Sequence, residues 1–374
     1  MTAAPNPSRT DVLIVGGGPA GAAAAVLLAR KGRQVVVVEK SAAAHDKVCG
    51  EFLSHEALQY LERLGLDLAA LGAASIEHLR LAADKQIATC RLPFPAKSLT
   101  RRTLDEALLA HAASSGATII RGCRVDALAC HGKEWTARLG NGGTHTAANA
   151  FLATGKHDLG SHPRSHGLQN DLVAFKMFYR LTPEQNAALA RHVELIVFPG
   201  GYAGLQLVED GSANLCLLVR RAQLRNCGGH WEGLLRLMLQ SSRFLAGRLE
   251  GAEPVHDKPL AVSSIPYGLL RGRATDELWR MGDQAAVIPS FSGDGISIAL
   301  HSAHLAAEMF LAGYQADAYQ MRLARELRRS VKMATTISRA VVASPHLVQF
   351  ARLCPPLLRP IANGTRVPAH LLFV

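Results

Sequence analysis

The sequence predicts an α/β fold with two domains and a helical C-terminal tail. Three observations lead to this prediction. A glycine-rich turn separates two short apolar runs near the N-terminus, segments that alternate apolar and polar residues lie between 172 and 219, and residues 315–374 mix apolar and basic side chains in a helical pattern. The chain has 374 residues, 48% of them apolar, which is enough for a large core and two domains.

The N-terminal stretch reads as one β-α-β unit. Apolar runs at Val12–Val15 and Val35–Val38 flank an Ala- and Leu-rich helix. Three glycines with G-x-G-x-x-G spacing lie between the first run and the helix: Gly16, Gly18 and Gly21. In this pattern the first glycine makes the tight turn, the second lets the backbone approach a pyrophosphate, and the third lets helix and strand pack closely. Glu39 ends the second run, where an acid can bind a ribose hydroxyl. The unit predicts a dinucleotide site.

The charge of the chain bears on which partners it binds, and its cysteine content bears on the redox state of its compartment. The formal net charge is +11, but aromatic residues make up only 5% and do not interleave with blocks of Lys or Arg. We therefore expect a solvated basic surface and no nucleic-acid partner. Seven cysteines without a C-x-x-C pair indicate a reducing compartment with neither a disulfide framework nor a zinc site. No signal peptide or membrane span is evident, so we expect a cytoplasmic protein.

Three further motifs follow along the chain. The run from Val48 to Ser54 reads V-C-G-E-F-L-S and precedes a clear helix at 55–64. Short strands over 76–99 lead to a helix that begins near Arg102 and carries Asp105 in its first turn. A buried strand then ends at Thr154-Gly155 in a turn of small residues.

The second half predicts an antiparallel sheet and a second nucleotide motif. Candidate strands at 172–181, 192–198, 202–208 and 213–219 precede a helix at 231–244. An apolar strand then ends in Gly282-Asp283, and after a loop containing Pro289 a helix begins at Gly293-Asp294-Gly295-Ile296.

These motifs together resemble flavoproteins of the geranylgeranyl reductase, p-hydroxybenzoate hydroxylase and flavin-dependent halogenase superfamily. The resemblance implies a Rossmann-like FAD-binding domain, an antiparallel-sheet substrate domain and C-terminal helices. We assign 1–75, 100–160 and 276–312 to the FAD-binding domain, 76–99 and 161–275 to the substrate domain, and 313–374 to the tail.

The resemblance also implies site residues. Those expected to bind FAD are Gly16, Gly18, Gly21, Glu39, Lys40, Arg102, Thr154, Gly155, Asp283, Gly293, Asp294, Gly295 and Ile296. Asp283 would bind a ribityl hydroxyl, and the backbone N–H groups of 293–296 would face the N1/O2 edge of the flavin, where a helix N-terminus stabilises negative charge. Catalytic candidates are Cys49, which could also be a small buried thiol, and Pro289, which would shape the loop facing the ring. We expect no metal site, because His301 and His304 lack a third ligand.

Departures from the superfamily motifs bear on the reaction. Reductases carry Tyr-x-Trp-x-Phe-Pro, of which only Tyr202 remains. Halogenases carry Trp-x-Trp-x-Ile-Pro, whereas residues 262–266 read V-S-S-I-P, and Lys176 lies in no motif that would make it the halogenating lysine. Thr154-Gly155 continues as Lys-His-Asp instead of the hydroxylase form. Halogenation is therefore disfavoured.

Three functions stay open, with the first favoured. The first is a monooxygenase of secondary metabolism that hydroxylates a lipophilic or aromatic small molecule through a flavin C4a-hydroperoxide. The second is an ene-reductase or dehydrogenase acting on an isoprenoid-like or carrier-bound substrate. The third is a flavoprotein that acts only with a partner, such as an acidic carrier protein or a flavin reductase. The chain has a single β-α-β fingerprint, so NAD(P)H would be a transient electron donor. For Leu353–Leu358 the alternatives are a packed helix, a cap on the substrate cavity, or a peripheral membrane contact.

Overall fold

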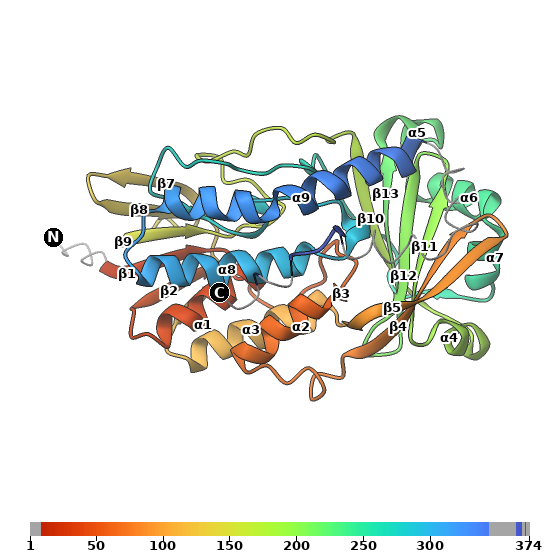
Figure 1. The fold of residues 1–374 in the computed structure, drawn as a ribbon, viewed down its shortest axis with the longest axis horizontal. Coiled ribbons are helices and arrows are strands. Elements are labelled where there is room, and N and C mark those ends of the chain that lie inside the picture. Colours follow the sequence, from red (N-terminus) through yellow and green to blue (C-terminus); the bar gives the residue numbers. More distant parts are fainter. Residues whose placement is uncertain (1–8, 344–363, 369–370, 372–374) are drawn as a thin grey trace.

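The computed structural model describes residues 9–343, 364–368 and 371 and contains two sheets (Figure 1). The predicted α/β fold class is confirmed. Residues 353–358, for which three alternatives were open, lie outside the described residues. Among the described residues no helix is long and apolar enough to cross a membrane.

The first sheet contains the N-terminal β-α-β unit. Its strand order is β6-β2-β1-β9-β8-β7, with β16 paired to β9. The strands are β1 (Arg9–Val15), β2 (Val35–Glu39), β6 (Thr118–Arg121), β7 (Val125–His131), β8 (Glu134–Leu139), β9 (Thr144–Leu152) and β16 (Trp279–Arg280). The strands β6, β2, β1, β9 and β16 are parallel, whereas β7, β8 and β9 pair antiparallel. The parallel pairing explains the apolar runs, because parallel strands are covered on both faces.

Helices cover this sheet. They are α1 (Pro19–Ala29), α2 (His55–Leu64), α3 (Arg101–Ser114), α8 (Gly295–Leu311) and α9 (Ala316–Ala343). The side chains of Ala22–Ala25 in α1 are fully buried, and their small size lets α1 pack closely against α3 and α8. In Figure 1, α1, α2 and α3 lie below the first sheet, and α9 lies above α8.

The second sheet is largely antiparallel and lies to the right in Figure 1. Its strand order is β14-β10-β13-β12-β11-β4-β5-β3, with β15 paired to β10. The strands are β3 (Phe52–Leu53), β4 (Ala74–Ala83), β5 (Gln86–Ser98), β10 (Leu172–Arg180), β11 (His192–Phe198), β12 (Gly201–Leu207), β13 (Ala213–Arg220), β14 (Glu253–Pro254) and β15 (Leu260–Ser263). Four helices lie on its outer side: α4 (Pro183–Leu189), α5 (Arg221–Asn226), α6 (Trp231–Ser241) and α7 (Arg243–Arg248).

The long helix α9 packs against the rest of the protein along its length. The Tyr319 hydroxyl donates to the carbonyl oxygens of Arg280 and Ser302 at 3.0 and 3.2 Å, and Tyr319 is fully buried. Towards its C-terminus α9 contacts β12, and Ser338 donates to Gln169 at 2.9 Å. The helix therefore packs against elements of both sheets.

Candidate functional site

A cavity of about 790 Å³ lies between the two sheets. One side is formed by the carboxyl ends of β1, β2 and β9 and by the start of α8, and the other by β10, β13 and β15. Ligands of α/β proteins bind at the carboxyl ends of parallel strands, so the cavity lies where the sequence motifs predict a site.

The glycine-rich loop forms a cradle of bare backbone. A Cβ atom built on Gly16 would overlap the carbonyl oxygen of Ala153, and one built on Gly21 would overlap the carbonyl oxygen of Gly16. Gly16 also has φ +105°, a conformation that favours glycine. Gly18 lines the cavity and caps α1 without a side chain, so the N–H groups of the first turn remain available to an anion. This backbone fits a diphosphate.

Glu39 lies at the edge of this cradle. Its carboxylate accepts hydrogen bonds from the backbone N–H groups of Gly17, at 2.7 Å, and Ser41, at 3.0 Å. Burial opposes ionisation, but the Gly17 bond and the charge of Lys47 lower the pKa of Glu39 overall. Glu39 and Lys40 both line the cavity. A charged carboxylate at this place can accept hydrogen bonds from a ribose.

The structure places Arg101, and not Arg102, on the cavity. Arg101 lines the wall beside Gly18 and pairs in a bidentate manner with Asp105, at 2.7 and 2.8 Å. Burial works against its charge, but Asp105 raises the pKa of Arg101. The Arg102 side chain is 53% exposed, pairs with Asp46 and does not line the cavity. The first turn of α3 decides which arginine faces inward, and the spacing to Asp105 alone did not predict it.

We expect Arg101→Gln to weaken FAD binding about 10- to 100-fold, because a hydrogen bond to a charged group contributes ~1.5–3 kcal/mol. Asp105 keeps Lys47 as a partner at 2.8 Å, which limits the effect on folding. The matched variant Arg102→Gln should bind FAD like the wild type. Fluorescence titration of both apoproteins with FAD measures the difference, and a larger loss in Arg102→Gln would contradict the placement.

The second motif reaches the same cavity. Asp283, Gly293, Gly295 and Ile296 line it, and α8 begins at Gly295, so the helix N-terminus faces the cavity. Asp294 does not line the cavity: it is fully buried, and burial raises its pKa to about 7.

The loop before α8 lines the cavity, but Pro289 itself does not. Pro289 was expected to shape the loop that faces the flavin ring. Its side chain is buried and does not line the cavity, whereas its neighbours Ile288 and Ser290 do. Pro289 directly precedes a short 3₁₀ turn at 290–292, so it shapes the loop without contacting the cavity itself.

Gln284 joins the two halves of the site and was not expected. Its amide donates to the carbonyl oxygens of Gly155, at 2.8 Å, and His157, at 3.0 Å. Thr154 and Gly155 both line the cavity, and Gly155 has φ +62°. Gln284 directly follows Asp283, so its place next to the motif was the available signal.

The Cys49–Glu51 segment forms another part of the wall. Cys49 is half-buried and lines the cavity, and its sulfur accepts a hydrogen bond from the Glu51 backbone N–H at 3.3 Å. The Asn214 amide holds the segment by donating to the carbonyl oxygens of Cys49 and Gly50, at 3.2 and 3.0 Å. Cys49 thus lines the cavity and also packs against the hydrophobic core, so the structure is compatible with both alternatives.

Behind this segment lies a buried ion pair between Glu51 and Lys176. Both side chains are fully buried, and the Lys176 ammonium also donates to the carbonyl oxygen of Lys47 at 3.2 Å. Burial raises the pKa of Glu51 to about 7, against the attraction of Lys176, which favours the charged form. Glu51 also has φ +60°, which is unusual for a residue with a side chain.

The wall opposite the glycine-rich loop is largely apolar. The residues that form it from the second sheet and the segment after β15 are Ala174, Cys216, Leu218, Leu260, Ala261, Val262, Ile265 and Tyr267. Burial raises the pKa of Cys216 to about 12 and also raises that of Tyr267, so both remain protonated and weakly acidic.

The two histidines of α8 serve packing. His301 contacts the Tyr60 hydroxyl at 2.7 Å and Glu326 at 2.8 Å, and His304 donates to the carbonyl oxygen of Leu300 at 3.0 Å. Among the described residues no group of His, Cys, Asp or Glu could hold a metal ion.

We expect His304 to make the folded protein sensitive to acid. Burial lowers its pKa from 6.5 to about 4, so the unfolded chain binds the proton more tightly. Stability should therefore fall by about 2 kcal/mol as the pH drops from 6.5 to 4. Denaturant unfolding of the wild type and of His304→Gln between pH 6.5 and 4 measures this loss of stability. If the free energy of unfolding falls equally steeply with pH in both proteins, His304 is not the cause.

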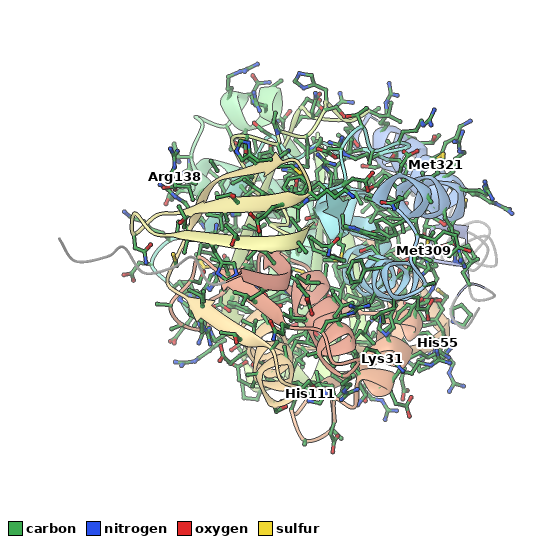
Figure 2. The ribbon with its side chains drawn as sticks, turned by 90° about the vertical axis from the view of Figure 1, so that its left-hand side faces the viewer. Lys31, His55, His111, Arg138, Met309 and Met321 are labelled. Atoms are coloured by element: carbon green, nitrogen blue, oxygen red, sulfur yellow. The ribbon has the colours of Figure 1, made fainter. Side chains whose placement is uncertain are left out.

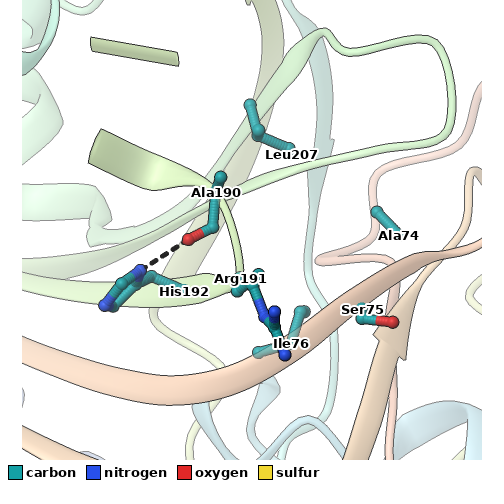
Figure 3. A pocket seen from close by; sticks show the side chains of 7 residues that line it. All are labelled: Ala74, Ser75, Ile76, Ala190, Arg191, His192 and Leu207. Carbon is teal, nitrogen blue, oxygen red and sulfur yellow. Dashed lines mark hydrogen bonds between the residues drawn. The ribbon is translucent and has the colours of Figure 1, made fainter. Parts of the chain in front are cut away.

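A second, smaller pocket of about 370 Å³ lies on the second sheet (Figure 3). Its lining residues are Ala74, Ser75, Ile76, Ala190, Arg191, His192 and Leu207. It shares no lining residue with the large cavity and contains no motif found in the sequence. The large cavity is therefore the candidate site.

The chain is similar to proteins of known family and structure. Residues 9–151 match the FAD binding domain family. The brominase Bmp2, a flavin-dependent enzyme, has a similar structure: the TM-score is 0.76 at 18% identity over 98% of this chain and 93% of Bmp2. A flavoprotein/dehydrogenase from Cytophaga hutchinsonii gives 0.75 at 17% identity, over 98% of this chain and 91% of that protein. The halogenase PltM, in complex with phloroglucinol and FAD, gives 0.72 at 15% identity, over 90% of this chain and 78% of PltM.

No curated protein is similar enough in sequence to count as a match. At these low identities the structural neighbours establish the fold, while the family match establishes the cofactor domain. Residues 9–151 carry an FAD binding domain, so the cofactor is FAD, and the chain shares its fold with the brominase Bmp2 and the flavoprotein/dehydrogenase.

Proposed function

We propose that this protein is an FAD-dependent monooxygenase that hydroxylates a lipophilic or aromatic small molecule. The observation that carries the proposal is the shape of the large cavity. The elements that fit FAD form one side, and the cavity continues onto an apolar wall from β10, β13 and β15. A wall of this kind suits an apolar substrate next to the cofactor.

Different residues on the cofactor side of the cavity would bind different parts of FAD. The bare backbone at Gly16–Gly21 and the Arg101 guanidinium would hold the diphosphate, Glu39 the ribose, and Asp283 a ribityl hydroxyl. The N-terminus of α8 would stabilise negative charge on the ring edge. When bound and reduced, FAD would supply the activation of molecular oxygen.

The apolar wall supports hydroxylation over alkene reduction. Side chains such as Leu218, Val262 and Ile265 would orient the substrate and exclude water, which protects a reactive oxidant. Alkene reduction also needs a proton donor, but Cys216 and Tyr267 on this wall are weakened as acids by burial. We therefore place reduction second.

Halogenation is a further candidate, because the names of several structural neighbours describe halogenases. We place it behind hydroxylation on one observation. The ammonium of Lys176, which lies on β10 of the second sheet, is buried in an ion pair with Glu51 and does not line the cavity. It is therefore not presented to a substrate there.

The experiment uses FAD-loaded protein reduced chemically, so that no electron-donating partner is assumed. A set of lipophilic and aromatic compounds is added with ¹⁸O-labelled oxygen and bromide, and products are read by mass spectrometry. Hydroxylation predicts a product that carries the label. A brominated product would assign a halogenase, and oxidation of the reduced FAD by an alkene without oxygen would assign a reductase.

A further inference from the structure

The positive charge of this protein is concentrated at its C-terminal end. Residues 318–374 contain nine Lys or Arg and one acid, Glu326, which is a net +8 of the total +11. Five of these cations are exposed on α9: Arg325, Arg328, Arg329, Lys332 and Arg339. We call these five residues the basic stripe.

The basic stripe follows one face of α9. Arg325, Arg328, Lys332 and Arg339 are three, four and seven residues apart, and Arg329 adjoins Arg328. This spacing places the five along one side of a helix with 3.6 residues per turn. From Arg325 to Arg339 the stripe extends about 21 Å at 1.5 Å per residue. The opposite face, with Leu323, Leu327 and Val331, is buried in the core.

Among the described residues no carboxylate pairs with the stripe. Among the described residues none of the five forms an ion pair, whereas Arg322 pairs with Glu326 at 2.9 Å. The residues that the structure does not describe include no Asp or Glu, so their side chains cannot supply one. Five uncompensated cations on one exposed face raise the local potential and attract an anionic surface.

Exposed apolar side chains accompany the stripe. Tyr314, 56% exposed, precedes α9, and Met321, 40% exposed, lies one turn before Arg325. Leu168 is 63% exposed and, with Thr335 of α9, flanks Gly268. In Figure 2 Met321 lies at the outer edge of the molecule, while Met309 of α8 lies further in.

We propose that the basic stripe, with Tyr314, Met321 and Leu168, binds the surface of an anionic lipid bilayer as a peripheral contact. Cations near an anionic leaflet and apolar side chains at the headgroup level together produce such binding. Charge alone would also suit an acidic protein, but the exposed apolar side chains beside the cations favour lipid. The proposal does not depend on which reaction the FAD site performs.

Vesicle flotation tests this surface with the full chain. Vesicles of phosphatidylcholine alone are compared with vesicles that also contain phosphatidylserine, at low and at high salt. We expect binding only to the phosphatidylserine vesicles, with a steep loss as salt screens the charges. The double variant Arg325→Gln/Lys332→Gln should bind about 30-fold more weakly, since each cation near the surface contributes ~1 kcal/mol, or about fivefold.

A matched control removes the same charges elsewhere. Lys133→Gln/Arg138→Gln changes two exposed cations of the β7–β8 hairpin, and Arg138 lies on the side of the molecule opposite Met321 in Figure 2. This variant should bind vesicles like the wild type. An equal loss in both variants, or no binding to phosphatidylserine vesicles at low salt, overturns the proposal. Binding to an acidic carrier protein without binding to vesicles would assign the stripe to a protein partner instead.

Discussion

Lys176→Met is expected to lower the free energy of unfolding by about 3–5 kcal/mol, because removing one partner of a buried ion pair leaves an uncompensated charge. Lys176 and Glu51 are both fully buried, and one carboxylate oxygen of Glu51 has no hydrogen-bond partner. Methionine fills a similar volume, so the loss would come from charge more than from packing. Urea unfolding at pH 8, where Glu51 favours the charged form, measures it.

Two variants isolate the cause of this loss. Glu51→Gln/Lys176→Met removes both charges and should recover much of the stability, since an uncharged buried pair carries a smaller desolvation cost. Arg243→Met breaks the ion pair with Asp84, whose side chains are largely exposed, and should leave the unfolding midpoint almost unchanged. A double variant as unstable as Lys176→Met would show that packing, and not the unpaired carboxylate, causes the effect.

Gly21→Ala is expected to abolish FAD binding and to destabilise the first domain by at least ~2 kcal/mol, as overpacking of a tight contact does. The new methyl group would overlap the Gly16 carbonyl oxygen, which is backbone and cannot turn aside like a side chain. Relief would require α1 to move away from β1, which would displace the helix N-terminus from the cavity.

Gly247→Ala is the matched control for this change. Gly247 lies in α7, has no positive φ, and has no atom near its would-be Cβ. It should bind FAD like the wild type and be slightly more stable, because alanine is the better helix former. Absorbance of the purified proteins reads FAD content, and full occupancy in Gly21→Ala would contradict the close packing.

The motifs with strict backbone requirements were predictable from the sequence. The spacing of Gly16, Gly18 and Gly21 between apolar runs located the β-α-β unit, because a tight turn and a close helix contact tolerate few other residues. The antiparallel second sheet was predictable from alternation and turns, and its strands begin and end within a few residues of the expected ranges.

Contacts that depend on side-chain direction were not predictable. The resemblance to the superfamily selected Arg102, but the first turn of α3 directs Arg101 to the cavity. Pro289 was expected to shape the loop that faces the ring, but which loop side chains reach the cavity was not predicted: Ile288 and Ser290 do, and Pro289 does not. Glu51 and Lys176 are far apart in the chain and form an ion pair because the loop that carries Glu51 packs against β10. No local sequence pattern signals such a contact.

Reconstitution of the apoprotein with FAD tests the central claim, that the two nucleotide motifs enclose one cofactor in the large cavity. Titration should show saturable binding of one FAD per chain, and protein loaded with FAD should lose it when Asp283 is replaced by alanine. A protein that stays colourless after incubation with excess FAD, or an Asp283→Ala variant that retains FAD at full occupancy, would contradict the account.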